Sequence, residues 1–213
     1  MTPAAQSAAA RRLCQIAPVI PVLVLQDAGR AEALAKALVA GGTPVLEVTL
    51  RTDAALEAIR AMSKVTGGHV GAGTVLTPDD VKRAKDAGAT FAVSPGATDR
   101  LIAACIDAEL PLLPGAATAS EAMRLADAGY DMLKFFPAEA IGGAPALKSL
   151  AGPLPRISFC PTGGITPEKA PSYLALPNVV CVGGSWIAPD KAVADGDWPG
   201  IEARAKAAAA LNG

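Results

Sequence analysis

The sequence predicts an α/β protein, a single-domain (β/α)8 or TIM barrel with parallel strands. Short apolar runs alternate with alanine-rich helical stretches along the chain, and this alternation is typical of βαβ units in a parallel sheet. The 213 residues, 51% of them hydrophobic, can bury one substantial core and lie near the lower end of the lengths that form such a barrel. We therefore expect a barrel domain over residues 16–213, preceded by an alanine-rich tail or short helix over 1–15.

Eight apolar runs are the expected strands, and eight is the number that closes a barrel. Most of them end beside glycine or proline, which is where strands give way to turns and helices. The expected strands cover residues 19–25, 44–50, 69–75, 91–95, 110–114, 132–136, 157–161 and 179–183.

The segments between these runs have the signals of helices. In TPDDVKRAKDAG, residues 77–88, Thr77 is a candidate N-cap and Pro78 takes the first helical position, with acidic residues in the first turn. TASEAMRLADAG repeats the pattern, with Thr118 or Ser120 as the cap. An open doubly wound sheet has the same alternation, so a second observation is needed to favour the barrel.

Side-chain alternation in VLEVTLR provides that observation. One face of this strand carries Val45, Glu47, Thr49 and Arg51, and the other carries Leu46, Val48 and Leu50. A strand covered by helices on both faces should be apolar throughout, and buried charges are costly unless their face lines a ligand cavity. The interior of a barrel near its catalytic end is such a place, so the pattern favours the barrel.

Composition limits the classes of partner. The 19 basic and 20 acidic residues nearly balance and form no basic run, so we expect neither nucleic acid nor a membrane surface as a partner. Four scattered cysteines, Cys14, Cys105, Cys160 and Cys181, and the single His69 argue against a metal site or disulfides. No segment resembles a signal peptide or a membrane span, and a reducing cytoplasm is the expected location.

Lys134 is the first candidate catalytic residue. It stands in the middle of an expected buried strand, between Leu133 and Phe135. Lysine is almost never fully buried unless it is paired or used, and burial favours the neutral amine that attacks carbonyl carbons. The alternative is structural: Lys134 reaches water at the strand end or pairs with a helix carboxylate.

Glu47 and Arg51 lie on the same face of the second expected strand. A carboxyl group in a partly desolvated pocket can relay protons during imine formation, so Glu47 is the candidate acid/base. Arg51 at the strand end suits a substrate carboxylate, to which Thr74 can add a hydroxyl. The structural alternatives are a Glu47–Arg51 salt bridge and, for Thr74, a cap or a strand-end hydrogen bond.

Two glycine pairs follow the seventh and eighth expected strands, where barrels often bind phosphate through backbone N–H groups. They are Gly163 with Gly164, and Gly183 with Gly184 followed by Ser185. Glycine after a strand is also ordinary turn chemistry. Their occurrence in both of these loops together predicts a phosphate subsite.

Taken together, these segments resemble the 2-keto-3-deoxy-6-phosphogluconate (KDPG) aldolase family, which also acts on 4-hydroxy-2-oxoglutarate. The similarity spans residues 19–186, whereas the N-terminal tail and PGAATASEAM differ from the family pattern. The matching motifs, in order, are EVTLRT, GAGTVL, SPG, KFFPAEA, CPTGG and VGGSW.

The resemblance implies a class I aldolase of the Entner–Doudoroff pathway on a (β/α)8 barrel, commonly a homotrimer that needs no metal or other cofactor. Lys134 would form the Schiff base and Glu47 would be the general acid/base. Arg51 and Thr74 would bind the pyruvate carboxylate. Pro95 and Phe136 would line the pocket, and Gly163, Gly164, Gly184 and Ser185 would hold the phosphate.

The expected reaction is cleavage of KDPG to pyruvate and glyceraldehyde 3-phosphate, together with cleavage of 4-hydroxy-2-oxoglutarate to pyruvate and glyoxylate. The galactonate epimer of KDPG is the alternative substrate. Two other readings are a phosphosugar isomerase or synthase that uses Lys134 only as an electrostatic anchor, and a sugar-phosphate sensor without turnover.

Overall fold

Strands and helices alternate along residues 1–211, the part of the chain that the computed structural model describes. The strands are β1 (Val19–Leu23), β2 (Val45–Thr49), β3 (His69–Gly73), β4 (Ala92–Val93), β5 (Leu112–Leu113), β6 (Gly115–Ala116), β7 (Met132–Phe135), β8 (Ser158–Pro161) and β9 (Val182–Gly184). They form a curled six-stranded sheet in the order β5-β4-β3-β2-β1-β9 and a three-stranded sheet in the order β6-β7-β8. Every pairing is parallel, as predicted.

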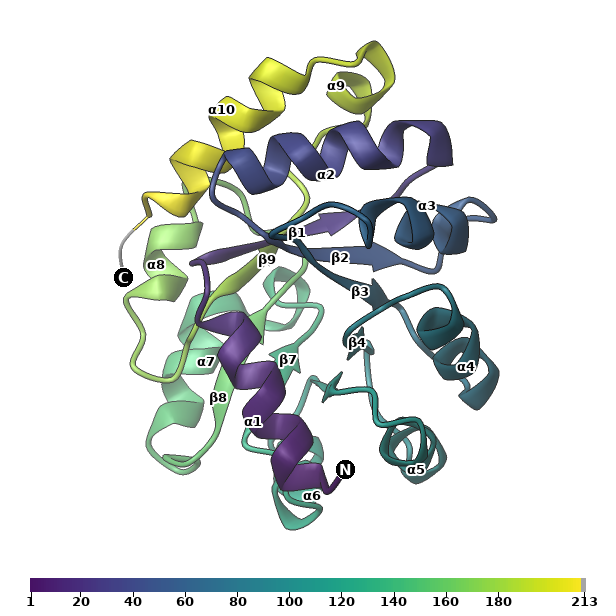
Figure 1. Ribbon diagram of the computed structural model, residues 1–213. Coiled ribbons are helices and arrows are strands. Elements are labelled where there is room, and N and C mark those ends of the chain that lie inside the picture. Colours follow the sequence, from purple (N-terminus) through teal and green to yellow (C-terminus); the bar gives the residue numbers. More distant parts are fainter. Residues whose placement is uncertain (212–213) are drawn as a thin grey trace.

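Helices surround these sheets on the outside (Figure 1). They are α1 (Pro3–Cys14), α2 (Ala31–Ala40), α3 (Ala55–Met62), α4 (Pro78–Asp86), α5 (Asp99–Asp107), α6 (Ala119–Asp127), α7 (Gly143–Ala151), α8 (Ala170–Leu174), α9 (Asp190–Asp195) and α10 (Trp198–Ala209), with 3-10 turns η1 (Ala28–Arg30) and η2 (Glu139–Ile141). Within residues 1–211, no helix is long and apolar enough to cross a membrane.

The two sheets meet at Pro114, inside the expected strand 110–114. That strand is in fact two short ones, since β5 ends before Pro114 and β6 begins after it. A proline has no N–H to donate to a strand ladder, but its carbonyl can still accept. The Pro114 carbonyl accepts from the N–H of Lys134 in β7 at 2.9 Å. The chain therefore passes from one sheet to the other at this residue.

Isolated bridges also lie between the other ends of the two sheets. Thr162, just after β8, bridges Gly183 in β9, and Phe159 in β8 bridges Val179. The expected eighth strand, 179–183, therefore begins as a single bridge and becomes a ladder from Val182 onward.

The predicted helix caps are correct where they can be checked. The Thr77 side chain accepts from the N–H of Asp80, whose carboxylate accepts from the N–H of Thr77, and Pro78 begins α4. Thr118, rather than Ser120, caps α6 in the same reciprocal way. These capping boxes satisfy N–H groups that lack partners at a helix start, and they fix where each helix leaves its strand.

The alternation predicted for β2 separates two apolar clusters. Leu46 and Val48 pack in the larger cluster beneath the helices. Val45 faces the opposite side, in a smaller set that we call the inner cluster. Its buried members are Ala10, Cys14, Ile20, Val45, Phe91, Val93, Leu113, Met132, Cys160 and Cys181. The strands therefore turn one face to each cluster, and Glu47 shares the inner face of β2 with Val45.

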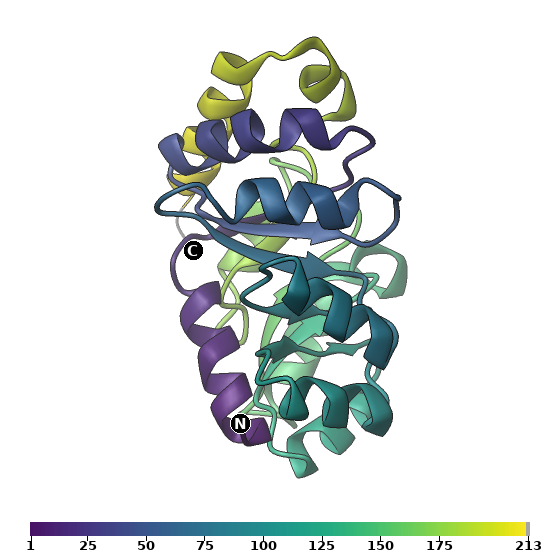
Figure 2. The same cartoon turned by 45° about the vertical axis from the view of Figure 1, so that its right-hand side comes forward.

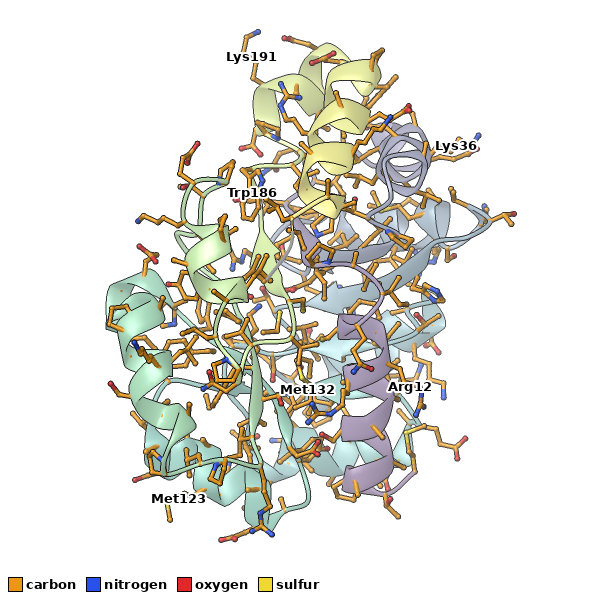
Figure 3. The ribbon with its side chains drawn as sticks, turned by 90° about the vertical axis from the view of Figure 1, so that its left-hand side faces the viewer. Arg12, Lys36, Met123, Met132, Trp186 and Lys191 are labelled. Carbon is orange, nitrogen blue, oxygen red and sulfur yellow. The ribbon has the colours of Figure 1, made fainter. Side chains whose placement is uncertain are left out.

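Helix α1 packs at the end of the sheets where the strands begin (Figure 2). The Ser7 hydroxyl accepts from the N–H groups of Asp131 and Met132 at 2.9 Å, and it donates to the Asp131 carboxylate at 2.7 Å. Figure 3 shows Met132, the first residue of β7, beside this helix. Residues 3–14 are therefore helical and cover the inner cluster. Of the expected domain 16–213, residues 212 and 213 lie outside the described chain.

Helices α2 and α10 pack so closely that the chain has room only for a glycine at position 41. A Cβ at Gly41 would lie 2.4 Å from the Ala205 side chain and 2.7 Å from the Glu202 carbonyl oxygen. We expect Gly41→Ala to lower the free energy of unfolding by about 1–3 kcal/mol in urea denaturation, because backbone must shift to admit the methyl group. Gly152→Ala is the control, since a Cβ there meets nothing within 4 Å. Equal stability of both variants would contradict the close approach.

Candidate active site

Lys134 and Glu47 form a buried ion pair in the interior. The Lys134 Nζ donates to Glu47 Oε1 at 3.1 Å, and the two residues are 5% and 3% exposed. Glu47 is the third residue of β2 and Lys134 the third of β7, so the pair joins strands from the two different sheets. Glu47 is thus paired with Lys134, and the alternative of a Glu47–Arg51 salt bridge is wrong.

Gly73 makes room for the Glu47 side chain, and sequence analysis missed this role. A Cβ at Gly73 would lie 2.3 Å from Glu47 Oε1 and 2.6 Å from its Cγ. In the same strand, a Cβ at Gly71 would lie 2.4 Å from the Phe91 ring. The signal in the sequence was the spacing of these two glycines in β3, which places both on one face.

Phe136 connects the ion pair to the cavity outside it. The Lys134 Nζ lies 5.3 Å from the centroid of the Phe136 ring, within the range of a cation–π contact. The ring also lines a cavity of about 230 Å³. One aromatic side chain therefore contacts both the buried amine and the open pocket.

This cavity gathers most of the residues predicted to bind substrate. It is lined by Val22, Val24, Arg51, Phe136, Thr162, Gly163, Gly164, Ile165, Gly183, Gly184 and Ser185. Six of these were predicted as substrate-binding residues. Thr162, Val22, Val24 and Ile165 were not singled out, because apolar or single-hydroxyl side chains give no chemical signal of their own in a sequence.

Arg51 and Thr74 lie together at the ends of neighbouring strands β2 and β3. The Arg51 Nε donates to the Thr74 hydroxyl at 3.2 Å. Thr74 has φ of 58°, an outlying backbone conformation for a β-branched residue. Such strain persists only where the surroundings enforce it, and it occurs often at functional sites. Thr74 does not line the cavity itself but contacts Arg51, which does.

The glycine loops adopt conformations that other residues rarely take. Gly163 and Gly164 have φ of 109° and 75°. A Cβ at Gly184 would lie 1.9 Å from the Trp186 ring. The next α-helices begin only at Ala170 and Asp190, so neither loop runs directly into a helix start. The groups in these loops that could bind an anion are therefore the backbone N–H groups and the Ser185 hydroxyl.

Pro95 is the predicted pocket residue that lies apart from the cavity lining. Its carbonyl oxygen would be 2.2 Å from a Cβ at Gly115, the β6 residue in register with Lys134. The close approach places the Pro95 backbone beside the strand next to Lys134. Its side chain is not part of the cavity wall.

A glutamate behind the first glycine loop links three elements. Glu139 accepts from the Tyr173 hydroxyl and pairs with Lys169, and a Cβ at Gly164 would lie 2.9 Å from the Glu139 Cβ. The Lys169 ammonium, followed by the Tyr173 hydroxyl, lowers the pKa of Glu139. Glu139 therefore stays ionised near neutral pH and holds α8 against the loop.

Potential metal ligands gather away from this cavity. Among residues 1–211, one group of three or more such side chains is close enough to share an ion: Cys14, Cys160 and Cys181. None of the three lines the cavity. The cysteines that are scattered in the sequence thus converge in the fold, which their spacing did not indicate.

Comparisons with known proteins point to a single family. A family model described as aldolase, KDPG and KHG aldolase, matches residues 11–204. A 2-dehydro-3-deoxy-phosphogluconate aldolase of Pseudoalteromonas atlantica is 53% identical, covering 91% of this chain and 90% of that protein. A KHG/KDPG aldolase of Escherichia coli K12 is 50% identical, covering 90% of each.

A solved structure is similar throughout. The KDPG aldolase of Legionella pneumophila, with pyruvate captured at low pH as a covalent carbinolamine intermediate, superposes with a TM-score of 0.91 at 45% identity, covering 94% of this chain and 98% of that one. Together with the family match, this likeness over nearly the whole length settles the family. The chain belongs to the KDPG and KHG aldolase family.

Proposed function

We propose that the protein is a class I aldolase that cleaves KDPG to pyruvate and glyceraldehyde 3-phosphate through a Schiff base on Lys134. The observation that carries the proposal is the buried amine 3.1 Å from a carboxylate, beside a cavity that contains an arginine and two glycine loops. The names of the relatives support the same substrate. Cleavage of 4-hydroxy-2-oxoglutarate to pyruvate and glyoxylate is part of the proposal, supported by the name of the Escherichia coli relative.

The first half of the reaction forms the iminium ion. Glu47 first takes a proton from the Lys134 ammonium with which it is paired, and the neutral amine adds to the C2 ketone of the substrate. Glu47 then carries protons to and from the carbinolamine oxygen. Water leaves as the C=N bond forms. The carboxylate lies 3.1 Å from the lysine nitrogen, within reach of the protons that must move there.

The second half breaks the C3–C4 bond. Glu47, directly or through water, takes the proton of the C4 hydroxyl, and the C3–C4 bonding electrons pass to the iminium nitrogen. Glyceraldehyde 3-phosphate leaves and a pyruvate enamine remains on Lys134. Protonation at C3 and hydrolysis by one water then release pyruvate and restore the amine.

The remaining site residues bind the two ends of the substrate. We assign the pyruvate carboxylate to Arg51, which Thr74 orients through their 3.2 Å hydrogen bond. The phosphate is assigned to the loops with Gly163, Gly164, Gly184 and Ser185. Phe136 packs against the reacting carbons, and Pro95 supports the wall through its backbone. Holding both ends aligns the C3–C4 bond with the iminium.

We also propose that the two sheets form one closed (β/α)8 barrel. The chain continues from β5 to β6 through Pro114, and bridges join the β8 end to β9. If β5 and β6 count as one strand, each strand then has two neighbours. The homotrimer and the cytoplasmic location implied by the family resemblance remain predictions, and light scattering of the purified protein tests the trimer.

Borohydride trapping tests the covalent step. We expect pyruvate with borohydride to add one reduced pyruvyl group to the wild-type protein, with peptide mapping placing it on Lys134. Lys134→Ala should lose the adduct and the turnover, because no amine remains to form the imine. Lys36→Ala, which alters a surface lysine on α2, is the control. An isomerase, a synthase or a sensor that uses Lys134 only as an anchor would give no adduct.

Gly73→Ala tests whether the position of Glu47 matters for proton transfer. Glu47→Gln should lower kcat by about two to four orders of magnitude, the range for a lost proton shuttle. Gly73→Ala keeps the carboxylate but displaces it, because the new methyl group occupies the space of its Oε1. We expect a kcat loss with KM nearly unchanged in the lactate-dehydrogenase-coupled assay. Wild-type kcat in Gly73→Ala would show that the placement of Glu47 is not required.

Ser185→Asp tests the phosphate subsite. A carboxylate in that loop repels a phosphate dianion, so kcat/KM for KDPG should fall by roughly tenfold or more. Cleavage of 4-hydroxy-2-oxoglutarate should fall much less, because this substrate has no phosphate and its second carboxylate is attached directly to C4. Ser185→Ala is the matched variant without the charge and should have the smaller effect. An equal loss on both substrates would place the phosphate elsewhere.

A further inference from the structure

Three of the four cysteines converge in the inner cluster, at the end of the fold that α1 covers. Cys14 ends α1, Cys160 lies in β8 and Cys181 directly precedes β9. Their sulfur atoms lie within 4.8 Å of one another, and the residues are 2%, 2% and 0% exposed. Cys105 on α5 is also buried, but it packs in the larger cluster beneath the helices.

The three thiols are close enough to change one another's pKa. Hydrogen bonds from Cys14 and then Cys181 lower the pKa of the Cys160 thiol, and the ammonium of Lys134 acts in the same direction. The other members of the inner cluster are apolar side chains, Ala10, Ile20, Val45, Phe91, Val93, Leu113 and Met132. Three polarizable sulfur atoms therefore face one another in apolar surroundings.

We propose that these three thiols form a binding site for trivalent arsenic, supplied as neutral arsenite, As(OH)3. Three S–As bonds form and three As–O bonds break. Each thiol proton leaves with a hydroxide as water, so no electron is transferred and no oxidant is needed. The product is a three-coordinate As(SR)3 centre that links α1 to β8 and to the residue before β9.

Coordination number and charge favour this class of ligand. Structural zinc sites are four-coordinate, whereas the cluster supplies three sulfur ligands. A three-thiolate complex of a monovalent or divalent cation would also carry net negative charge into an apolar region, which is costly. The arsenic complex is neutral. Arsenic–sulfur bonds of about 2.3 Å, the length typical of zinc–sulfur bonds, would place the sulfur atoms within roughly 4 Å of one another. In the structure they lie within 4.8 Å of one another, so binding requires them to approach by no more than about an ångström.

Helix α1 forms one wall of this site. Ser7 fastens it to Asp131 and Met132, and Arg11 donates to the Ser158 hydroxyl and to the Asp131 carbonyl oxygen. Because Cys14 is on α1 while its two partners belong to the sheets, bound arsenic would cross-link the helix to them. Arsenite should therefore stabilise the folded protein, since the fold already holds the three thiols together whereas the unfolded chain must bring them together from distant positions.

Intact-protein mass spectrometry with reduced protein and sodium arsenite tests the site. The wild type should gain one arsenic atom and lose three hydrogen atoms, and its thermal midpoint should rise. Cys14→Ala and Cys160→Ala should each weaken arsenite binding by about tenfold or more, because a third S–As bond cannot form. Any residual adduct in these variants should retain one hydroxyl group. Cys105→Ala, the control, should bind arsenite as the wild type does.

Two outcomes would overturn the proposal: no adduct in the wild type, or equal adducts in the wild type and Cys14→Ala. Ser7→Ala keeps every thiol and gives a second measurement if a cysteine variant fails to fold. Because it loosens α1, we expect faster adduct formation with the same stoichiometry. An unchanged rate in Ser7→Ala would contradict α1 as the wall through which arsenite arrives.

Discussion

The buried pair of Lys134 and Glu47 is the interaction on which the rest of the structure depends. It brings together one charged side chain from each sheet, at 3.1 Å and almost out of contact with water. Removing one partner of such a pair leaves an uncompensated buried charge, which costs about 3–5 kcal/mol, so the pair constrains the sheets as well as the chemistry. In the proposed reaction, the lysine nitrogen of this pair attacks a ketone.

Glycines in β3 leave the space that the Lys134–Glu47 pair and its neighbours occupy. Gly73 leaves the volume that the Glu47 side chain fills, and Gly71 does the same for Phe91. On the opposite side of the pair from the cavity, the inner cluster and α1 fill the interior. The inner cluster and α1 thus fill one end of the interior, and the cavity with the glycine loops lies at the other end.

The residues assigned to the two ends of the substrate come from different parts of the fold. Arg51 and Thr74 stand at the ends of β2 and β3, while the glycine loops follow β8 and β9. The strained backbone of Thr74 is consistent with a hydroxyl fixed in advance against the arginine. In the proposed site, the groups assigned to bind anions lie at strand ends and in loops, while the proposed reacting pair is on strands. Under that proposal, substrate preference can change without moving the reacting atoms.

Sequence alone determined the parallel α/β class, the regions of the strands and the Thr77 cap, because strand alternation and capping are local patterns in a sequence. Charges and glycines at predicted strand ends, together with the resemblance to a known family, predicted six of the residues that line the cavity. The sequence also identified Lys134 and Glu47 from charges placed in apolar strands. Only the tertiary structure decided that Pro114 divides the fifth strand between two sheets, that Gly73 seats Glu47, and that Cys14 meets Cys160 and Cys181. Those contacts join residues far apart in the chain, and sheet curvature and helix docking set their distances, neither of which leaves a local pattern.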